Sequence, residues 1–263
     1  MRPSRIKAKL NRGEPALVTT IHAIDPSFHE LASLMGFDGL WLDLEHHPVS
    51  LETAAGLMRA TRVGTADALV RPAKGEFMRM GRILEAGAQG IMYPRCSDAA
   101  EAREVVQWAK FAPLGRRGVD SGNADTPYCL MPLDRYVREA NEQTFVVVQL
   151  EDPGAVANAR EIAEVEGVDV LFFGPGDYSV LTGVPGQFQH PTIEEAIREV
   201  AAAARAAGKH WGIPVGSPER AKQMLDLGAR LLAYGADLIW VQQGLEETRR
   251  RFAPLGFTFD GQF

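Results

Sequence analysis

Short apolar runs recur along the chain, each bounded by glycine, proline or aspartate. Runs of this length are typical of strands that are buried on both faces of a sheet. Between them lie longer segments whose apolar residues recur every three or four positions, as in amphipathic helices. The two types alternate strictly, eight of each. We expect strands at residues 16–21, 38–44, 66–71, 90–94, 145–150, 169–174, 211–215 and 231–235, and helices at 27–35, 50–62, 75–87, 97–109, 154–164, 192–207, 217–228 and 238–252.

Glycines mark the ends of several predicted helices. Gly36, Gly87, Gly167 and Gly228 each follow a helical segment, and a strand begins within a few residues of each. The residue just beyond a helix often has a left-handed backbone, which glycine adopts at little cost. These positions therefore support the predicted boundaries.

The spacing of strand ends favours a barrel of parallel strands. Asp43 to Arg71 is 28 residues and Glu151 to Asp177 is 26, each about one strand-plus-helix unit. A barrel of eight such units typically needs about 250 residues, and the chain has 263. Arg95 to Glu151 is 56 residues, about twice the unit. We predict an α/β fold: a single-domain (β/α)8 TIM barrel, with a loop and short helix inserted after the fourth strand.

The insertion covers residues 113–144. It contains a polar loop at 116–125 and a short helical pattern at 133–141. Long loops at the carboxyl rim of a barrel usually serve as lids or contact a neighbouring subunit. We expect such a functional role for this segment.

Composition excludes several classes of protein. The chain is 46% hydrophobic and 24% charged, as in ordinary globular proteins. A net charge of -6 argues against a nucleic-acid surface. No apolar stretch approaches the roughly 18 residues of a membrane span, and the basic start lacks the apolar core of a secretory signal. Two cysteines, Cys96 and Cys129, form no disulfide framework. We expect a cytoplasmic protein.

Two acidic residues follow neighbouring predicted strands. Glu151 ends the run Val-Val-Val-Gln-Leu-Glu, and Asp177 ends Leu-Phe-Phe-Gly-Pro-Gly-Asp. Either residue alone could be a helix cap or a surface group. Together, at matching depth in a parallel barrel, they favour a pair of oxygen ligands for a hard divalent cation, with coordination positions left open for substrate oxygens and water.

A second group of polar residues follows the second and third strands. Asp43, Glu45, His46 and His47 crowd one rim loop in the segment Trp41-Leu-Asp-Leu-Glu-His-His-Pro48, and an Asp–His pair is the minimal general-base arrangement. Either histidine could be the active one. Arg71 ends an apolar strand, where a guanidinium needs an anion and could face an oxyanion rather than solvent. Further candidates for the rim are Arg95 and His22.

The residues that several other reaction types require are missing from the sequence. A Schiff-base aldolase needs a lysine in the barrel mouth, and only Lys74 lies near the predicted rim. A nucleophile elbow, a phosphate-binding Gly-x-x-x-x-Gly-Lys loop and a dinucleotide fingerprint do not occur in the sequence.

An ordered set of motifs resembles a known family over nearly the whole chain. It resembles the 4-hydroxy-2-oxoheptanedioate and 2-dehydro-3-deoxyglucarate aldolases, metal-dependent pyruvate aldolases of the phosphoenolpyruvate–pyruvate barrel superfamily. The motifs are Gly36-Phe-Asp-Gly-Leu-Trp-Leu-Asp-Leu-Glu-His46, Val70-Arg-Pro72, Gly87-Ala-Gln-Gly90, Gly115-Arg-Arg-Gly-Val119, Val148-Gln-Leu-Glu151, Gly167-Val-Asp169, Gly174-Pro-Gly-Asp-Tyr-Ser179 and Gly235-Ala-Asp237.

The resemblance implies a role for each matching residue. Glu151 and Asp177 match the ligands of a divalent ion, Mg²⁺, Mn²⁺ or Co²⁺. Arg71 matches the arginine that steadies the pyruvate enolate, and Gln149 matches a pocket residue. The backbone N–H groups of Gly176 and Asp177 would bind the pyruvate carboxylate.

The acid–base dyad implied by the resemblance is His46 with Asp43. The implied reaction is the reversible cleavage of a 4-hydroxy-2-oxo acid into pyruvate, or a close 2-oxo acid such as hydroxypyruvate, and an aldehyde. The alternatives are a related metal-dependent lyase or decarboxylase of a keto or hydroxy diacid, and a non-catalytic metabolite-binding barrel.

The family also implies a homohexamer, a trimer of dimers that exchange their last helix, in which the loop around residues 117–121 completes a neighbour's site. Some positions depart from the family pattern and are expected to surround the acceptor aldehyde. These are His22, the run Tyr93-Pro-Arg-Cys96, Trp211 and the loop 123–131.

Overall fold

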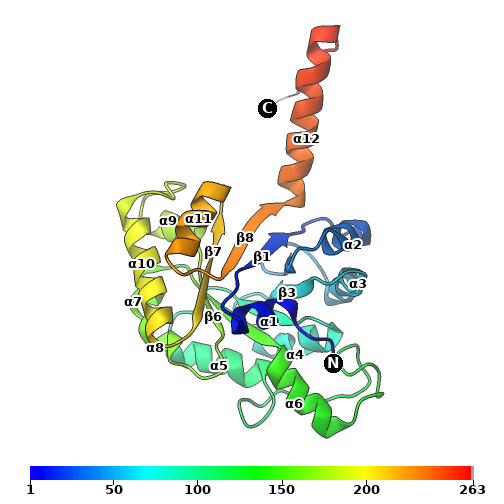
Figure 1. The fold of residues 1–263 in the computed structure, drawn as a ribbon, viewed down its shortest axis with the longest axis vertical. Coiled ribbons are helices and arrows are strands. Elements are labelled where there is room, and N and C mark those ends of the chain that lie inside the picture. Colours follow the sequence, from blue (N-terminus) through cyan, green and yellow to red (C-terminus); the bar gives the residue numbers. More distant parts are fainter. Residues whose placement is uncertain (262–263) are drawn as a thin grey trace.

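The computed structural model describes residues 1–261 and contains a closed barrel of eight parallel strands (Figure 1). The strands pair in chain order, and β8 closes the barrel against β1. The predicted TIM barrel is therefore confirmed. The strands are β1 (Ala16–Thr20), β2 (Gly39–Asp43), β3 (Asp67–Arg71), β4 (Gly90–Tyr93), β5 (Phe145–Leu150), β6 (Val170–Phe173), β7 (His210–Val215) and β8 (Leu231–Ala236).

Helices surround the strands in Figure 1, except that α12 extends away from the barrel. Most helices alternate with strands along the chain, as predicted. They are α1 (Arg5–Asn11), α2 (Pro26–Leu34), α3 (Leu51–Thr61), α4 (Phe77–Ala86), α5 (Ala99–Ala109), α6 (Leu133–Gln143), α7 (Pro153–Ala157), α8 (Ala159–Ala163), α9 (Pro175–Leu181), α10 (Pro191–Ala206), α11 (Pro218–Asp226) and α12 (Asp237–Phe252), followed by the 3₁₀ helix η1 (Ala253–Leu255).

The predicted boundaries agree closely with the structure, with three differences. The helix expected at 154–164 is divided into α7 and α8 at Asn158. Helices α1 and α9 were not predicted. The four glycines expected beyond helix ends all have positive φ, between 87° and 117°.

Alternating strand residues divide the core into two parts. Residues such as Val18, Leu69 and Phe172 fill the interior of the barrel, and Ile6 and Leu10 of α1 join them. The residues between, such as Val70 and Leu171, pack outward against the helices. Because α1 contributes to the interior cluster, it closes the end of the barrel at which the strands begin.

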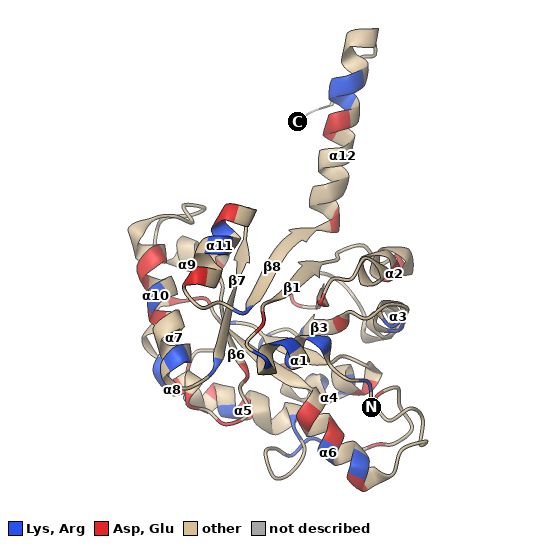
Figure 2. Cartoon of the chain, in the orientation of Figure 1, with Lys and Arg blue, Asp and Glu red and all other residues tan. Residues whose placement is uncertain are grey.

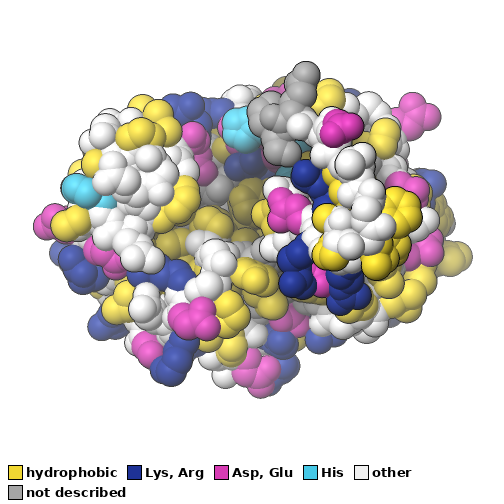
Figure 3. Space-filling view, turned by 90° about the horizontal axis from the view of Figure 1, so that it is seen from above, with side chains coloured by type: hydrophobic (Ala, Val, Ile, Leu, Met, Phe, Trp, Pro, Cys, Tyr) yellow, Lys and Arg dark blue, Asp and Glu magenta, His cyan; other side chains and the backbone are white. Residues whose placement is uncertain are grey.

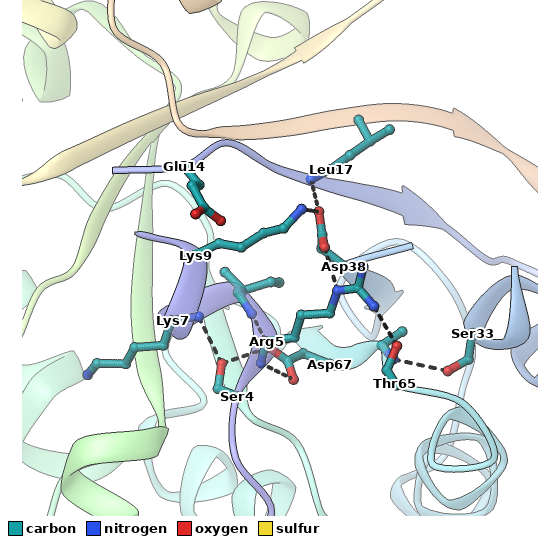
Figure 4. Close-up of polar contacts among 12 residues, drawn as sticks. Ser4, Arg5, Lys7, Lys9, Glu14, Leu17, Ser33, Asp38, Thr65 and Asp67 are labelled. Carbon is teal, nitrogen blue, oxygen red and sulfur yellow. Dashed lines mark hydrogen bonds and ion pairs between the residues drawn. The ribbon is translucent and has the colours of Figure 1, made fainter. Parts of the chain in front are cut away.

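Polar contacts fix α1 in that position (Figure 4). The buried carboxylate of Asp67 accepts hydrogen bonds from Ser4 Oγ at 2.7 Å and from the backbone N–H groups of Arg5 at 3.1 Å and Ile6 at 2.8 Å. Burial raises the pKa of Asp67 to about 6. Nearby, Asp38 accepts hydrogen bonds from Arg5 at 2.6 Å and from Lys9 at 2.8 Å.

The insertion lies at the same end of the barrel as α1, so the expectation that it belongs to the carboxyl rim was wrong. It leaves the carboxyl end of α5 and leads into β5, and a helix-to-strand connection must run where strands begin. The Met1 ammonium contacts Glu139 of α6 at 2.9 Å, and Arg62, beyond α3, donates to the Ala124 carbonyl at 3.2 Å. The insertion cannot be a lid over this chain's own rim, whereas contact with a neighbouring subunit stays a prediction.

Helix α12 has little contact with the rest of its own chain. It follows β8 and extends outward in Figure 1, and Leu238, Val241 and Leu245 on it are exposed. Figure 3, which looks onto the free end of the helix, shows a hollow beside it with hydrophobic side chains at its floor. An apolar cavity of about 260 Å³ lies between α2 and the start of α12, lined in part by Phe28 and Trp240.

Charges of both signs are interspersed over the outer helices (Figure 2). Within residues 1–261, no helix combines the length and apolar character needed to cross a membrane.

We expect Asp67→Ala to lower the free energy of unfolding by about 3 kcal/mol, because it leaves buried donors at the start of α1 without an acceptor. Asp67→Asn, which retains one carbonyl oxygen, should cost less. Chemical denaturation monitored by circular dichroism measures both, with Asp226→Ala on the exposed surface as a control expected to lie within about 0.5 kcal/mol of the wild type. An Asp67→Ala protein as stable as the wild type would contradict this account of the barrel's closed end.

Candidate active site

The two acidic residues expected at neighbouring strand ends lie together in the structure. Glu151 directly follows β5, and Asp177 lies in the first turn of α9, which follows β6. Strands β5 and β6 pair directly. Glu151 is only 4% exposed, and its Oε2 atom is buried without a hydrogen-bond partner among the described residues. Burial, together with the nearby Asp177, raises the pKa of Glu151 to about 8.

This pair fits a divalent cation. A buried carboxylate with an unpaired oxygen is unfavourable, and a second carboxylate beside it adds repulsion. A hard cation removes both penalties, because it takes oxygen ligands and supplies positive charge. Residues 1–261 contain no group of three or more His, Cys, Asp or Glu side chains arranged to hold a metal. The pair would thus leave coordination positions open for other oxygen ligands.

A glycine gives Glu151 the space it occupies. Gly174 precedes α9, and a Cβ atom there would lie 2.6 Å from Cγ and Oε1 of Glu151. A Cβ atom added at Gly176 would meet nothing within 4 Å. In the Gly-Pro-Gly sequence before Asp177, the first position therefore has no room for a side chain. The second glycine borders open space.

Arg71 connects the polar residues at the ends of β2, β3 and β5. It donates two hydrogen bonds to Asp43, from Nε at 2.9 Å and Nη2 at 2.7 Å, and one to Gln149 Oε1 at 3.4 Å. The guanidinium also lies over the Trp41 ring, 4.8 Å from its centroid. Burial disfavours the charge of Asp43, but the bonds to Arg71 outweigh it and hold the pKa of Asp43 below its usual value.

Glu45 was placed in the rim loop from the sequence, but no role was assigned to it. Its Oε2 atom lies 3.2 Å from Arg71 Nε, and burial raises the pKa of its carboxyl group. The available signal was its position two residues after Asp43, on the same loop. Arg71 therefore contacts two carboxylates from one loop and lies close enough to Glu151 for a favourable charge interaction.

The two adjacent histidines face different carboxylates. The His46 side chain is 59% exposed, and its Nε2 atom lies 3.6 Å from Glu45 Oε2. His47 Nε2 lies 3.9 Å from Asp43 Oδ2. In the described residues the imidazole turned toward Asp43 is therefore that of His47, and the role expected for His46 with Asp43 stays a prediction.

Of the positions that depart from the family pattern, His22 clearly lies beside the candidate site, since its ring contacts the ring of His47 with centroids 4.5 Å apart. Arg95 is exposed, with a φ of 49°.

The other positions that depart from the family pattern were also expected to surround the acceptor aldehyde. In this chain they do not. Tyr93 packs outward and donates to Glu101 at 2.8 Å. Trp211 is buried near the start of β7, in the layer between strands and helices. The loop 123–131 belongs to the insertion at the opposite end of the barrel.

Comparisons with known proteins agree with this architecture. The family model described as HpcH/HpaI aldolase/citrate lyase matches residues 21–243. The chain is 36% identical to a hydroxypyruvate/pyruvate aldolase of Delftia acidovorans, over 90% of this chain and 88% of that protein. It is 34% identical to a 4-hydroxy-2-oxo-heptane-1,7-dioate aldolase of Shigella sonnei, over 94% of each.

A crystal structure of an HpcH/HpaI aldolase from Desulfitobacterium hafniense superimposes with a TM-score of 0.88, at 28% identity, over 94% of this chain and 95% of that one. The match of the family model, the identity to curated aldolases over most of their length and the shared barrel lead to one conclusion. The chain is an enzyme, an aldolase or lyase, and belongs to the HpcH/HpaI aldolase/citrate lyase family.

Proposed function

We propose that this enzyme reversibly cleaves a 4-hydroxy-2-oxo acid into pyruvate, or a close 2-oxo acid such as hydroxypyruvate, and an aldehyde. The observation that carries the proposal is the buried carboxylate of Glu151 with the more exposed Asp177 close to it, beside the fixed guanidinium of Arg71. Two relatives named for aldolase reactions of this kind support it. Such a site suits a reaction in which negative charge develops on a 2-oxo acid.

Glu151 and Asp177 would hold a divalent metal ion, Mg²⁺, Mn²⁺ or Co²⁺. When bound, such an ion acts as a Lewis acid that stabilises negative charge on the 2-oxo group. The unpaired Oε2 atom of Glu151 supports this role, since it is a buried acceptor that nothing in the described chain satisfies.

The other residues would bind and orient the 2-oxo acid. Arg71 cannot turn freely, because Asp43 holds two of its nitrogens and Glu45 lies beside one of them. A guanidinium fixed in this way stabilises a developing oxyanion without reorganising during the reaction. Gln149 borders Arg71, and the backbone N–H groups of Gly176 and Asp177 would bind the carboxylate of the substrate.

Proton transfer completes the reaction. In the cleavage direction, His46 would accept the proton of the C4 hydroxyl while the C3–C4 bond breaks. The bonding electron pair remains on C3 and forms the enolate, and C4 becomes the aldehyde carbon. Return of the proton to C3 then gives the methyl group of pyruvate, so that no further reactant is consumed. Glu45, 3.6 Å from His46 Nε2, would orient the His46 ring, and Asp43 would act with it once the ring turns inward from its exposed position.

The active form would be a homohexamer, built as a trimer of dimers that exchange α12. The apolar residues on α12 that are exposed in the single chain support this proposal, as does the apolar cavity between α2 and α12. A helix with an uncovered apolar stripe needs a partner surface in water. A second copy of the chain offers the same helix and the same cavity in return.

Replacement of either proposed metal-binding carboxylate should greatly reduce turnover. Glu151→Gln or Asp177→Asn should lower kcat/KM for pyruvate release about 1000-fold, since a Lewis-acid contribution of several kcal/mol is lost. Mn²⁺ binding measured by electron paramagnetic resonance should weaken in parallel, and Glu164→Gln on the exposed surface is the matched control. Unchanged turnover of the wild type after exhaustive chelation would rule out the metal mechanism.

The space beside Glu151 can be tested separately. Gly174→Ala should displace the Glu151 side chain and lower kcat/KM about 100-fold, the typical effect of misplacing a reactive group by about 1 Å. Gly56→Ala, in the open face of α3, is the control and should retain wild-type activity with equal or higher stability. A fully active Gly174→Ala enzyme would show that the contact with Glu151 does not matter.

A charged residue on α12 should prevent assembly. We expect Leu245→Asp to convert the oligomer to smaller species in sedimentation-velocity experiments. Each copy would lose the about 1.5–3 kcal/mol that burial of a leucine side chain contributes, and assembly would have to desolvate a charge instead. Gln243→Glu, on a polar position of the same helix, should keep the assembly. An unchanged sedimentation coefficient for Leu245→Asp would exclude α12 from the interface.

A further inference from the structure

A second aspartate–histidine pair lies at the carboxyl rim, on the strands β8 and β1. His22 follows β1, and Asp237 is the first residue of α12, directly after β8. His22 Nδ1 lies 2.9 Å from Asp237 Oδ1. The Asp237 side chain is only 1% exposed, and it also accepts the backbone N–H groups of His22 at 3.0 Å, Ala23 at 2.7 Å and Leu238 at 2.9 Å. One carboxylate thus fixes both the backbone and the ring of His22.

This contact determines which nitrogen of His22 is free. Burial disfavours the charge of Asp237, but the backbone N–H donors outweigh it and keep the pKa of Asp237 below its usual value. An ionised carboxylate can only accept a hydrogen bond, so Nδ1 of His22 carries the hydrogen. In the neutral ring Nε2 then carries a lone pair. No hydrogen-bond partner for that nitrogen occurs among residues 1–261.

His47 adds a second imidazole to the pair. Its ring centroid lies 4.5 Å from that of His22, and burial, with His22 next in effect, lowers the pKa of His47. Its Nε2 atom faces Asp43 at 3.9 Å, and the charge of Asp43 is already balanced by Arg71. A neutral imidazole has one N–H donor and one acceptor nitrogen, so the His47 ring offers an acceptor in either tautomer. The side chains are 22% exposed for His22 and 32% exposed for His47, so both can be reached from solvent.

The pair lies where the distal part of a substrate must go, if the proposed function holds. The 2-oxo acid would occupy the side of the rim formed by β3, β5 and β6, where Arg71, Glu151 and Asp177 lie. The part derived from the aldehyde must then extend across the mouth. His22 and His47, at the ends of β1 and β2, lie on that other side.

We propose that His22 and His47 determine acceptor specificity by binding a hydroxyl group on the aldehyde portion, so that the preferred substrates are 4-hydroxy-2-oxo acids with at least one further hydroxyl beyond C4. In their neutral forms both rings present an acceptor nitrogen, for which a hydroxyl supplies the hydrogen-bond donor. An alkyl chain has none. A carboxylate would bring only acceptors, near the charges of Asp43 and Asp237.

The test is aldol addition of pyruvate, with Mg²⁺ or Mn²⁺, to two aldehydes of equal size, glycolaldehyde and propionaldehyde. The wild type should favour glycolaldehyde in kcat/KM about tenfold, the factor expected for about one hydrogen bond. His22→Asn keeps a side-chain N–H for Asp237 but lacks the second ring nitrogen, so the ratio should fall toward one, and His47→Asn should act likewise. His210→Asn, at the start of β7 and so at the opposite end of the barrel from the rim, should keep the wild-type ratio.

Three results would overturn the inference: a wild-type ratio near one, a His22→Asn and His47→Asn pair that both retain the wild-type ratio, or a wild type that prefers succinic semialdehyde, the carboxylate-bearing probe, to glycolaldehyde. Deuterium exchange at the pyruvate methyl group distinguishes these three results from a failure of the proposed function. If the proposed function is wrong, the wild type should show neither exchange nor addition to any aldehyde. If His22→Asn does not fold, as judged by its melting temperature, His47→Asn carries the test, because its ring anchors no buried partner.

Discussion

The excess of acidic groups around one buried arginine is the constraint on which the rest of the site depends. Arg71 interacts with Asp43, Glu45 and Glu151, and Asp177 adds a further carboxylate. Arg71 donates its two short hydrogen bonds to Asp43, and none to Glu151. Burial of Glu151 outweighs its attraction to Arg71, so its pKa is raised, and its Oε2 atom has no hydrogen-bond partner among the described residues. A site in this condition attracts a cation far more strongly than an isolated surface carboxylate would.

The barrel produces this crowding through its register. Asp43 pairs with Arg71 across β2 and β3, and the Gly174 N–H bonds to the Leu150 carbonyl, so the residues that follow these strands emerge at one level. The opposite end is closed by α1, whose contacts with Asp67 and Asp38 serve stability. Separating the stabilising end from the reactive end lets charged groups remain poorly paired at the rim without unfolding the protein.

The sequence predicted the strands and the main helices because burial on both faces leaves an unmistakable apolar run. It missed α9, since Gly174-Pro175-Gly176 reads as a loop although proline suits the first turn of a helix. The insertion was assigned to the wrong end because spacing alone does not show whether extra residues follow a strand or a helix. The contact between His22 and Asp237 joins residues 215 positions apart, which no local pattern encodes.

Asp237 links the specificity of the rim to the path of α12. The same carboxylate that fixes the His22 ring also accepts the N–H of Leu238 in the first turn of that helix. A change in the direction of α12 would move Asp237, and with it the imidazole pair on the acceptor side. The 2-oxo acid side has no such dependence, because Arg71, Glu151 and Asp177 come from other elements. Exchange of α12 between subunits, as proposed, would therefore influence which aldehyde is accepted more than it influences the formation of the enolate.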